Sequence, residues 1–356
     1  MNGKNKMIAW IAGIIGVIIL LIVVIVRIEP EKEGITRAEV SKALALALAD
    51  RKECEAEAKQ REKSWFSEQE QDNWFVKYMD LLYERGYLNP ELTPADLESA
   101  QKEFTYQEAA YTAAKFSGRL KRQVGLKDKN RQKPFPADQW WELYREILKE
   151  ADPDENVKEI TAILYGTPSN IQGAPSWTAY TTEGEYGFQG LALDAWLDHE
   201  IRFMVRGNEI AAVTAVKNGS VVYRNIWLSE VKDGVFKAYM GAASREFKAE
   251  GKLAEEAKKT EGRLAPNLAD LYVEHGRLSR VTVKKERIHG KILSVTEDTV
   301  EIEGYGTIPL DENFYVYKLF GEFSVLGAAD ILVGYDLQEF VAADGKLCAA
   351  LLERPF

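Results

Sequence analysis

Some residues of this sequence have side chains that could do chemistry, but none of them completes a catalytic motif. His199 and Glu200 begin the stretch HEIRF, which starts like the zinc-binding helix of a metalloprotease. Phe203 stands where the second histidine would have to be, and the alternating apolar and polar residues around it predict a strand. The stretch therefore does not predict a zinc site.

Acidic pairs are the second candidate for chemistry, because glycosidases use two carboxyl groups as acid and base. Asp194 with Asp198 and Asp311 with Glu312 are such pairs, but the chain has 56 acidic residues, so pairs arise by chance. The glycine-rich stretches GEYGFQG and EGYGTIP lack the Lys-Ser/Thr of a phosphate-binding loop. We therefore predict a protein that is not an enzyme and holds no cofactor and no metal.

Aromatic side chains are better candidates for binding, because their flat faces pack on other rings and on sugars. The tryptophans outside the N-terminal apolar run include Trp65, Trp74, Trp140, Trp141, Trp177, Trp196 and Trp227. Neighbours on a helix point about 100° apart, so at most one of Trp140 and Trp141 faces the core. The other is predicted to be half-exposed and to contact a partner or another domain.

The first segment is predicted to cross a membrane. Residues 8–26 carry no charge and would span about 30 Å as a helix, so we predict an uncleaved anchor at 8–27. Lys4 and Lys6 precede the span, and acidic residues follow Arg27, which places the tail 1–7 in the cytoplasm. We therefore expect a single-pass protein of the cytoplasmic membrane, with its C-terminal ectodomain on the extracytoplasmic side.

Charge and cysteine content limit what the ectodomain does. The chain has a formal charge of −10, and without Lys4, Lys6 and Arg27 the remainder carries −13, which argues against binding nucleic acid. Cys54 and Cys348 are the two cysteines of the chain, so a disulfide framework is excluded. We expect both to be unpaired, although a single long-range bridge remains open.

Residues 34–151 have a helical pattern. In ITRAEV and in FTYQEA, a threonine is followed three residues later by a glutamate, which is the capping box that begins a helix. Between these two boxes, NWFVKYMDLLYERGYL predicts a helix that ends at Gly86. LTPADLESA predicts a further helix, with Thr93 as its cap and Pro94 as its first residue.

This order of parts resembles the S-layer-homology modules of bacterial surface proteins, in which a Thr-Arg-Ala-Glu motif opens a helix. Thr36-Arg37-Ala38-Glu39 matches the motif, Trp74 fits its tryptophan-led helix, and Tyr106 replaces the motif arginine in the second copy. The resemblance covers residues 34–118, about one and a half modules. It implies binding to a cell-wall polysaccharide, usually by three modules, with Arg37 as a contact. A helical domain without wall affinity is the alternative.

From Val157 the period changes to two, which predicts strands. EIAAVTAVKNGSVVYRNIWL predicts a hairpin with its turn at Asn218-Gly219, and EFVAADGKLCAALL predicts one at Asp344-Gly345. TTEGEYGFQGLALD and EGYGTIPLD suggest a repeat. We therefore expect two tandem small β-barrel or sandwich units, at 157–245 and 272–356, joined by a charged connector at 246–271 that is a mobile segment or a short helix.

A weaker resemblance is to the region that precedes the catalytic domain in some clostridial wall proteins of the stage II sporulation protein D and amidase-enhancer family. It is carried by the order of anchor, helical module and paired β units ending in KLCAALLERP. It implies an accessory region of a peptidoglycan-cleaving enzyme, and no active-site residue.

The sequence thus predicts an α+β, membrane-anchored bacterial envelope protein, non-enzymatic, that binds cell-wall glycan or an envelope protein partner in wall remodelling or sporulation. The candidate contacts are Arg37, Trp74, Tyr106, Trp140 and Trp141. Two alternatives stay open: the accessory region just described, and an assembly scaffold that oligomerises through β edges, with FYVYKLF at a protein interface.

Overall fold

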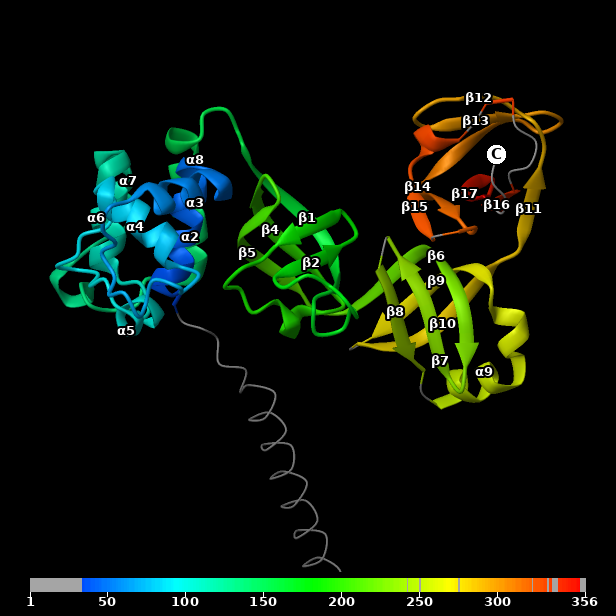
Figure 1. Cartoon of the computed structure of the whole chain (residues 1–356), viewed down its shortest axis with the longest axis horizontal. Helices are drawn as coiled ribbons and strands as arrows, with labels where there is room; N and C mark the ends of the chain where they lie inside the picture. The colour runs from blue at the N-terminus through cyan, green and yellow to red at the C-terminus, as the bar shows by residue number, and fades with distance from the viewer. Residues whose placement is uncertain are drawn as a thin grey trace, which may run out of the picture. The chain divides into compact units, whose positions relative to one another are not determined.

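The computed structural model describes residues 34–352 except 242, 250, 275, 322, 332 and 335–338. Within these residues, no helix is both long enough and apolar enough to cross a membrane. The predicted tail at 1–7 and anchor at 8–27 lie outside the described residues. The chain divides into two compact units, Met1–Glu155 and Asn156–Phe356. It has an α+β architecture, helical first and then β-rich (Figure 1).

The described part of the first unit is built from helices, as the sequence predicts. Its elements are α2 (Arg37–Leu48), α3 (Arg51–Gln60), α4 (Val76–Glu84), α5 (Leu97–Gln101), α6 (Tyr106–Phe116), α7 (Gly118–Gln123), the 3-10 turn η1 (Asp128–Asn130) and α8 (Ala137–Ala151). The alanine-rich helix α2 is buried on most of its sides, and nine of its residues are buried. It therefore forms the central helix on which the others pack.

Both predicted capping boxes are present. Thr36 accepts a hydrogen bond from the amide of Glu39, whose carboxylate accepts from the Thr36 amide, and Thr105 and Glu108 do the same at the start of α6. Each box satisfies two amides that the first turn of a helix leaves without partners. The apolar residue before each threonine is buried, which fixes the direction in which the chain enters the helix.

Two other helix boundaries gave different results. Gly86 follows α4 with a φ of 72°, which confirms the predicted glycine stop. The predicted cap at Thr93 is wrong, because α5 begins at Leu97 and Asp96 is its cap. The Thr93 hydroxyl instead donates to the carboxylate of Glu108, a tertiary contact that the local sequence does not indicate.

The second unit begins with a small five-stranded barrel. Its strands are β1 (Val157–Gly166), β2 (Thr178–Thr181), β3 (Gly184–Gly187), β4 (His199–Arg206) and β5 (Glu209–Lys217), in the order β1-β2-β3-β5-β4. β1 also pairs with β4, and the contact between β3 and β5 that closes the barrel is a single parallel pair, Gly187 with Glu209. HEIRF lies in β4, which confirms the predicted strand.

A second sheet follows, in the order β10-β9-β6-β7-β8. Its elements are β6 (Ser220–Lys232), β7 (Val235–Met240), β8 (Ala243–Lys248), α9 (Gly251–Leu264), β9 (Asn267–Glu274) and β10 (Arg277–Lys284). α9 lies in the predicted connector, so of the two alternatives the short helix is correct. It packs its apolar side on the sheet through the fully buried Ala257.

The third sheet has the order β11-β16-β17-β14-β13-β12, with β15 paired to β14. Its elements are β11 (Glu286–His289), β12 (Ile292–Val295), β13 (Thr299–Ile302), β14 (Gly306–Lys318), β15 (Ser324–Leu326), the turn η3 (Ala328–Asp330), β16 (Glu339–Ala343) and β17 (Lys346–Leu352). FYVYKLF begins in β14, which pairs with β17, β13 and β15. β14 is therefore an interior strand.

Of the two predicted hairpins, one is confirmed and one is wrong. Asp344 and Gly345 have φ values of 52° and 75° and join the paired strands β16 and β17. Asn218-Gly219 joins β5 to β6, but β5 pairs with β3 and β4 while β6 pairs with β7 and β9. At this turn the chain passes from the barrel, which contains β5, to the second sheet, which contains β6.

The two expected β units are three sheets in the structure. The first expected unit, 157–245, contains the whole barrel and part of the second sheet. The strand β9 of that sheet begins inside the expected connector, and β10 lies beyond it. The suggested repeat falls on different structures, because Leu193-Asp194 is in the 3-10 turn η2 (Leu193–Trp196) and Leu310-Asp311 is inside β14. Local patterns reveal strands, but the choice of strand partners is made by long-range packing.

Candidate functional site

Three short extended segments meet in the first unit, and each leads into a helix. Residues 34–36, 103–105 and 134–136 precede α2, α6 and α8, and isolated β-bridges join them: Gly34 with Pro136, Thr36 with Glu103, and Thr105 with Pro134. We call this arrangement the three-segment junction. It brings together the N-termini of three helices that are far apart in the sequence.

The middle segment makes backbone hydrogen bonds to both of the others. Phe104 N donates to Ile35 O at 2.8 Å, and Phe135 N donates to Phe104 O at 2.7 Å. The side chains of Ile35, Phe104 and Phe135 are 5%, 0% and 2% exposed. The junction is therefore a packed apolar point with its backbone groups satisfied, which fixes where the three helices begin.

The third segment does not carry the complete motif of the other two. FPADQ has the same pattern as FTYQE, with an apolar residue first and Gln139 where the second copy has Glu108, but Pro136 replaces the threonine. Pro136 lacks a hydroxyl, and α8 has no side-chain cap at its start. The signal that could have found it is the spacing of Phe135 and Gln139, since glutamine also serves at the third position of a capping box.

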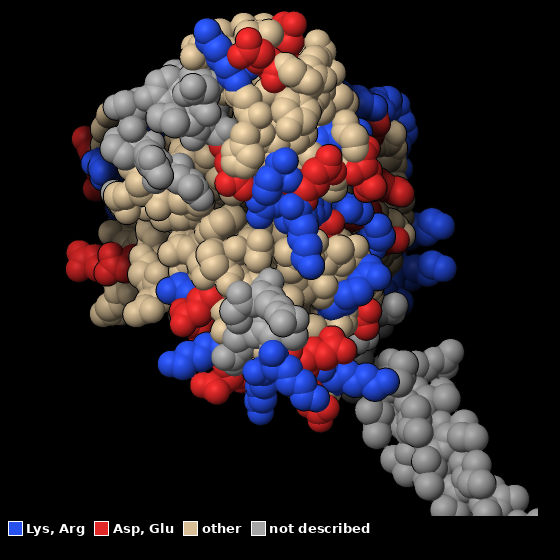
Figure 2. Space-filling model, turned by 90° about the vertical axis from the view of Figure 1, so that its right-hand side faces the viewer, with Lys and Arg blue, Asp and Glu red and all other residues tan. Residues whose placement is uncertain are grey.

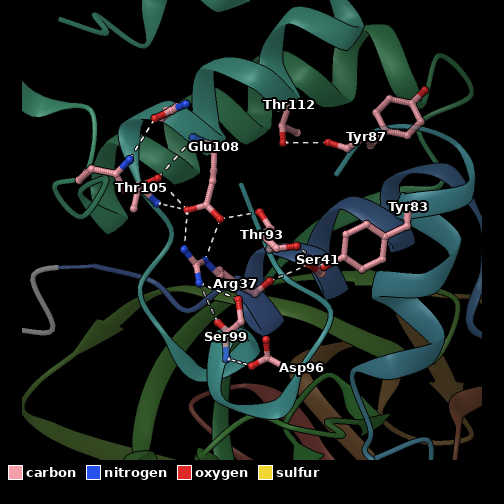
Figure 3. A network of polar contacts seen from close by, with 12 residues as sticks. Arg37, Ser41, Tyr83, Tyr87, Thr93, Asp96, Ser99, Thr105, Glu108 and Thr112 are labelled. Carbon is pink, nitrogen blue, oxygen red and sulfur yellow. Dashed lines mark hydrogen bonds and ion pairs between the residues drawn. The ribbon is translucent and has the colours of Figure 1, made fainter. Parts of the chain in front are cut away.

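Arg37 links the first copy of the motif to the second (Figure 3). Its Nε lies 2.7 Å from Glu108 Oε1, and its Nη2 lies 3.3 Å from Glu108 Oε2. Its Nη1 donates to Ser99, at 2.7 Å to Oγ and 3.2 Å to the carbonyl oxygen. Arg37 thus joins the first turn of α2 to α5 and α6.

The Glu108 carboxylate is the centre of this network. It also accepts from the Thr105 amide at 2.9 Å, from the Thr105 hydroxyl at 2.7 Å and from the Thr93 hydroxyl. Its side chain is 2% exposed and that of Arg37 is 11% exposed. A charge at this depth needs its counter-charge, so the main role visible for Arg37 is to hold the helices, with a small part of its guanidinium left accessible.

The two neighbouring tryptophans of α8 have different environments, as predicted. Trp140 is fully buried, and its ring meets Phe104 of the three-segment junction edge-on, with the centroids 5.4 Å apart. Trp141 is half-buried, and its ring lies 6.3 Å from Trp140 and 6.1 Å from Tyr144. Trp141 therefore keeps part of its surface available for contact, whereas Trp140 belongs to the core.

Tyr106 and Trp74, the remaining candidates, are both half-buried. Tyr106 follows Thr105 and meets Phe135 edge-on at 4.9 Å, so it lies against the three-segment junction. Trp74 precedes α4 and packs on Phe75 and Tyr78. The structure thus brings Arg37, Tyr106 and Trp140 to the junction, with Trp141 beside Trp140, while Trp74 packs on α4.

A hollow of about 680 Å³ lies beside the third segment of the junction. Its lining combines apolar and polar side chains from α7 and α8 and from the segment before α8, among them Val124, Phe135, Gln139, Leu143 and Arg145. Two carboxylates, Glu142 and Glu146, complete the polar part of the lining. Phe135 is the residue that this hollow shares with the three-segment junction.

The groups considered for catalysis take part in other contacts. Asp194 Oδ1 accepts from the hydroxyls of Thr167 and Ser169, while Asp198 forms an ion pair with Arg245, so the two acids do not act on a common centre. His199 Nδ1 lies 2.9 Å from the carbonyl oxygen of Leu197. Across the described residues, no three His, Cys, Asp or Glu side chains gather as metal ligands would.

The two cysteines are both buried and unpaired, as expected. Burial raises the pKa of the Cys54 thiol to about 12. Because the thiolate is the reactive form, Cys54 is an inert part of the core of the first unit.

On the face of the molecule in Figure 2, Lys and Arg side chains are interspersed with Asp and Glu. The comparisons with known proteins give no assignment, because no family model matches this chain and a search of curated proteins finds no match.

Proposed function

We propose that this chain is a membrane-anchored, non-enzymatic protein of the cell envelope that binds cell-wall glycan through its helical unit. The three-segment junction is the observation that carries the proposal. The S-layer-homology modules that residues 34–118 resemble act in sets of three, and the junction joins three related segments, each opening a helix. In this proposal the third segment, which has Pro136 in place of the motif threonine, stands for the third copy.

Half-exposed aromatic side chains supply the binding surface in this proposal. Tyr106 and Trp141 are half-buried, with Tyr106 packed on Phe135 and Trp141 on Trp140. The hollow lined by Phe135 and Gln139 lies on the third segment of the junction. Sugar rings pack on aromatic faces, amide groups donate hydrogen bonds to sugar hydroxyls and accept them, and carboxylates accept them. Arg37 contributes mainly by fixing the helices that carry these residues.

The location is part of the same proposal. Residues 8–27 anchor the chain, the tail 1–7 is cytoplasmic, and the acidic remainder faces the wall. An envelope protein partner on the same surface is the competing ligand.

Sedimentation with purified cell-wall sacculi tests the proposal. The full-length protein in detergent micelles is mixed with sacculi that retain or lack their secondary polymers. We expect Trp141→Ala and Tyr106→Ala each to weaken binding about two- to tenfold, which corresponds to roughly 0.5–1.5 kcal/mol of aromatic packing. Trp177→Ala is the matched control, because Trp177 is 43% exposed but lies in the second unit.

Binding that requires the secondary polymer and weakens in the two variants supports the proposal. Failure to sediment with either type of sacculus, or equal binding by all variants, would overturn it. Arg37→Ala is a poor test by itself, because it leaves the buried Glu108 carboxylate without its counter-charge.

A further inference from the structure

A buried polar cluster in the second unit has no part in the proposed binding. Asn225, Asp270 and Lys284 come from β6, β9 and β10, and we call them the Lys-Asn-Asp cluster. Asn225 is fully buried, and the side chains of Lys284 and Asp270 are 11% and 8% exposed. An amine, an amide and a carboxylate thus meet where little water reaches them.

The amine and the carboxylate both contact the asparagine. The Lys284 ammonium donates to Asn225 Oδ1, and its Nζ lies 3.1 Å from Asp270 Oδ1. Asp270 Oδ1 also accepts from the backbone N–H of Asn225 at 3.0 Å. Asn225 has a φ of 55° at a break in the register of β6 and β9, so the strand is locally irregular where its side chain meets the lysine.

The nitrogen of the Asn225 side-chain amide is held by the third sheet. Its Nδ2 donates to Asp311 Oδ1 and to the carbonyl oxygen of Asn313, each at 2.9 Å, and Tyr317 donates to its backbone carbonyl at 2.6 Å. The amide therefore cannot rotate freely, and its plane is fixed relative to the lysine.

We propose that Lys284 and Asn225 join through an intramolecular isopeptide bond. Asp270 accepts one proton from the ammonium, and the resulting amine adds through its lone pair to Cγ of Asn225. The bond from Cγ to Nδ2 then breaks, its electron pair leaves with Nδ2, and a second proton from Nζ moves to Nδ2. Ammonia departs and takes the proton held by Asp270, so the carboxylate is regenerated. The reaction needs no oxidant, metal or cofactor.

The buried cluster should make this reaction faster than the reaction of a free amine with a free amide in water. Holding an amine against an amide turns a reaction between two molecules into an internal one, which raises its rate by many orders of magnitude. The Asp270 carboxylate oxygen lies 3.1 Å from the Lys284 nitrogen, so a proton acceptor stands within hydrogen-bond reach of the nucleophile. Cys348 Sγ is 3.6 Å from Nζ, and burial raises the pKa of this thiol, so it is neutral and does not hold the lysine as an ammonium.

The bond would act as a disulfide acts in other extracellular proteins. It closes a loop between two residues 59 positions apart and ties β6 to β10 across β9, which lies between them. Lys284 is the last residue of β10, two residues before β11 of the third sheet begins. The link therefore fixes the place where the chain passes from one sheet to the next, in a protein whose two cysteines are unpaired.

Mass spectrometry of the denatured full-length protein tests the proposal. We expect an intact mass lower than that of the sequence by one ammonia molecule, and a branched peptide that contains both Lys284 and Asn225 after proteolysis. A mass equal to that of the sequence, with linear peptides carrying both residues unmodified, would overturn it. The readout does not depend on glycan binding, so the two proposals succeed or fail separately.

Two variants test whether Lys284 is the nucleophile and Asp270 the base. Lys284→Met removes the nucleophile and Asp270→Asn keeps an acceptor oxygen but removes the base, so we expect both proteins to retain the ammonia. Lys285→Ala is the matched control, because Lys285 is the exposed neighbour and its loss should leave the bond in place. A branched peptide that persists in Lys284→Met would contradict the assignment of the amine.

Discussion

Each unit contains a buried pair of an arginine and a carboxylate. One pair lies in a recognisable sequence motif, and the other does not. Arg37 and Glu108 lie in two copies of a recognisable motif and join the helix starts of the first unit. Arg245 and Asp198 lie in no motif, and they join β8 of the second sheet to the residue just before β4 of the barrel. Both pairs connect elements distant in sequence.

The second pair is the more completely enclosed. Arg245 Nη1 and Nη2 contact both oxygens of Asp198 at 2.5 and 2.6 Å, Tyr223 donates to Asp198 at 2.6 Å, and Arg245 also donates to the Tyr165 carbonyl oxygen. Burial raises the pKa of Tyr223, so its hydroxyl stays a donor. Burial alone would lower the pKa of Arg245, but the bond to Asp198 outweighs it and the pKa is raised.

The comparison shows that a motif does not by itself identify a binding residue. The motif predicts Arg37 as a ligand contact, yet the contacts of Arg37 resemble those of Arg245, which no motif marks. The two ion pairs differ in the residues that surround them. Half-exposed aromatic rings and a hollow lie near the first pair, whereas the second is enclosed between two sheets.

Removing Asp198 should have the largest effect on stability. Asp198→Ala leaves the guanidinium of Arg245 and the hydroxyl of Tyr223 buried without their acceptor, and we expect a loss of about 3–5 kcal/mol in the free energy of unfolding. Urea denaturation followed by β-sheet circular dichroism measures it. Glu200→Ala is the control, because the Glu200 pair with Lys217 is exposed and its loss should cost less than about 1 kcal/mol. Equal losses would show that the buried pair has no special role.

A smaller loss is expected in the first unit. Glu108→Gln keeps an acceptor oxygen for Thr93 and Thr105 but removes the charge that Arg37 faces, so we expect about 1–3 kcal/mol, measured by the loss of helical circular dichroism. Combining it with Arg37→Met should cost less than the sum of the two single changes, because the second removal no longer leaves a charge alone. Additive costs would mean that the pair does not couple.

The smallest effect depends on pH and concerns the pair of the buried Arg61 with the exposed Glu84. The hydrogen bond from Arg61 lowers the pKa of Glu84 below its ordinary value of 4.5. A lowered pKa in the folded state adds stability above pH 4.5, and this contribution is lost as the pH falls through the folded value. The Glu84 side chain is 41% exposed, so screening limits the effect to a few tenths of a kcal/mol. Glu84→Gln should flatten the profile of unfolding free energy below pH 4.5, measured by urea denaturation at a series of pH values, and an unchanged profile would contradict this.

The local features of the fold were predictable from the sequence to the extent that a few neighbouring residues determine them. Both threonine caps, the glycine stop at Gly86, the strand at HEIRF and the turn at Asp344-Gly345 depend on contacts within a few positions. Thr93 and Asn218-Gly219 were misassigned for the opposite reason. Thr93 is recruited by Glu108, and the strands on either side of Asn218-Gly219 pair in different sheets.

The candidate site was predicted in its parts but not in its arrangement. The helical spacing showed that Trp140 and Trp141 must face different ways, and the structure places Trp140 in the core. The third segment of the junction was missed because Pro136 replaces the capping threonine. The pairing of Arg37 with Glu108 spans 71 positions and was not evident from either motif copy alone.

The sequence by itself determined the helical and β-rich halves, the two capped helices and the absence of a disulfide framework, because each follows from residue type and short-range geometry. The tertiary structure alone decided that three segments form one junction, that Arg37 and Arg245 serve as internal links, and that Lys284 meets Asn225. These depend on burial, which brings distant charges and amides into contact and makes each of them require a partner.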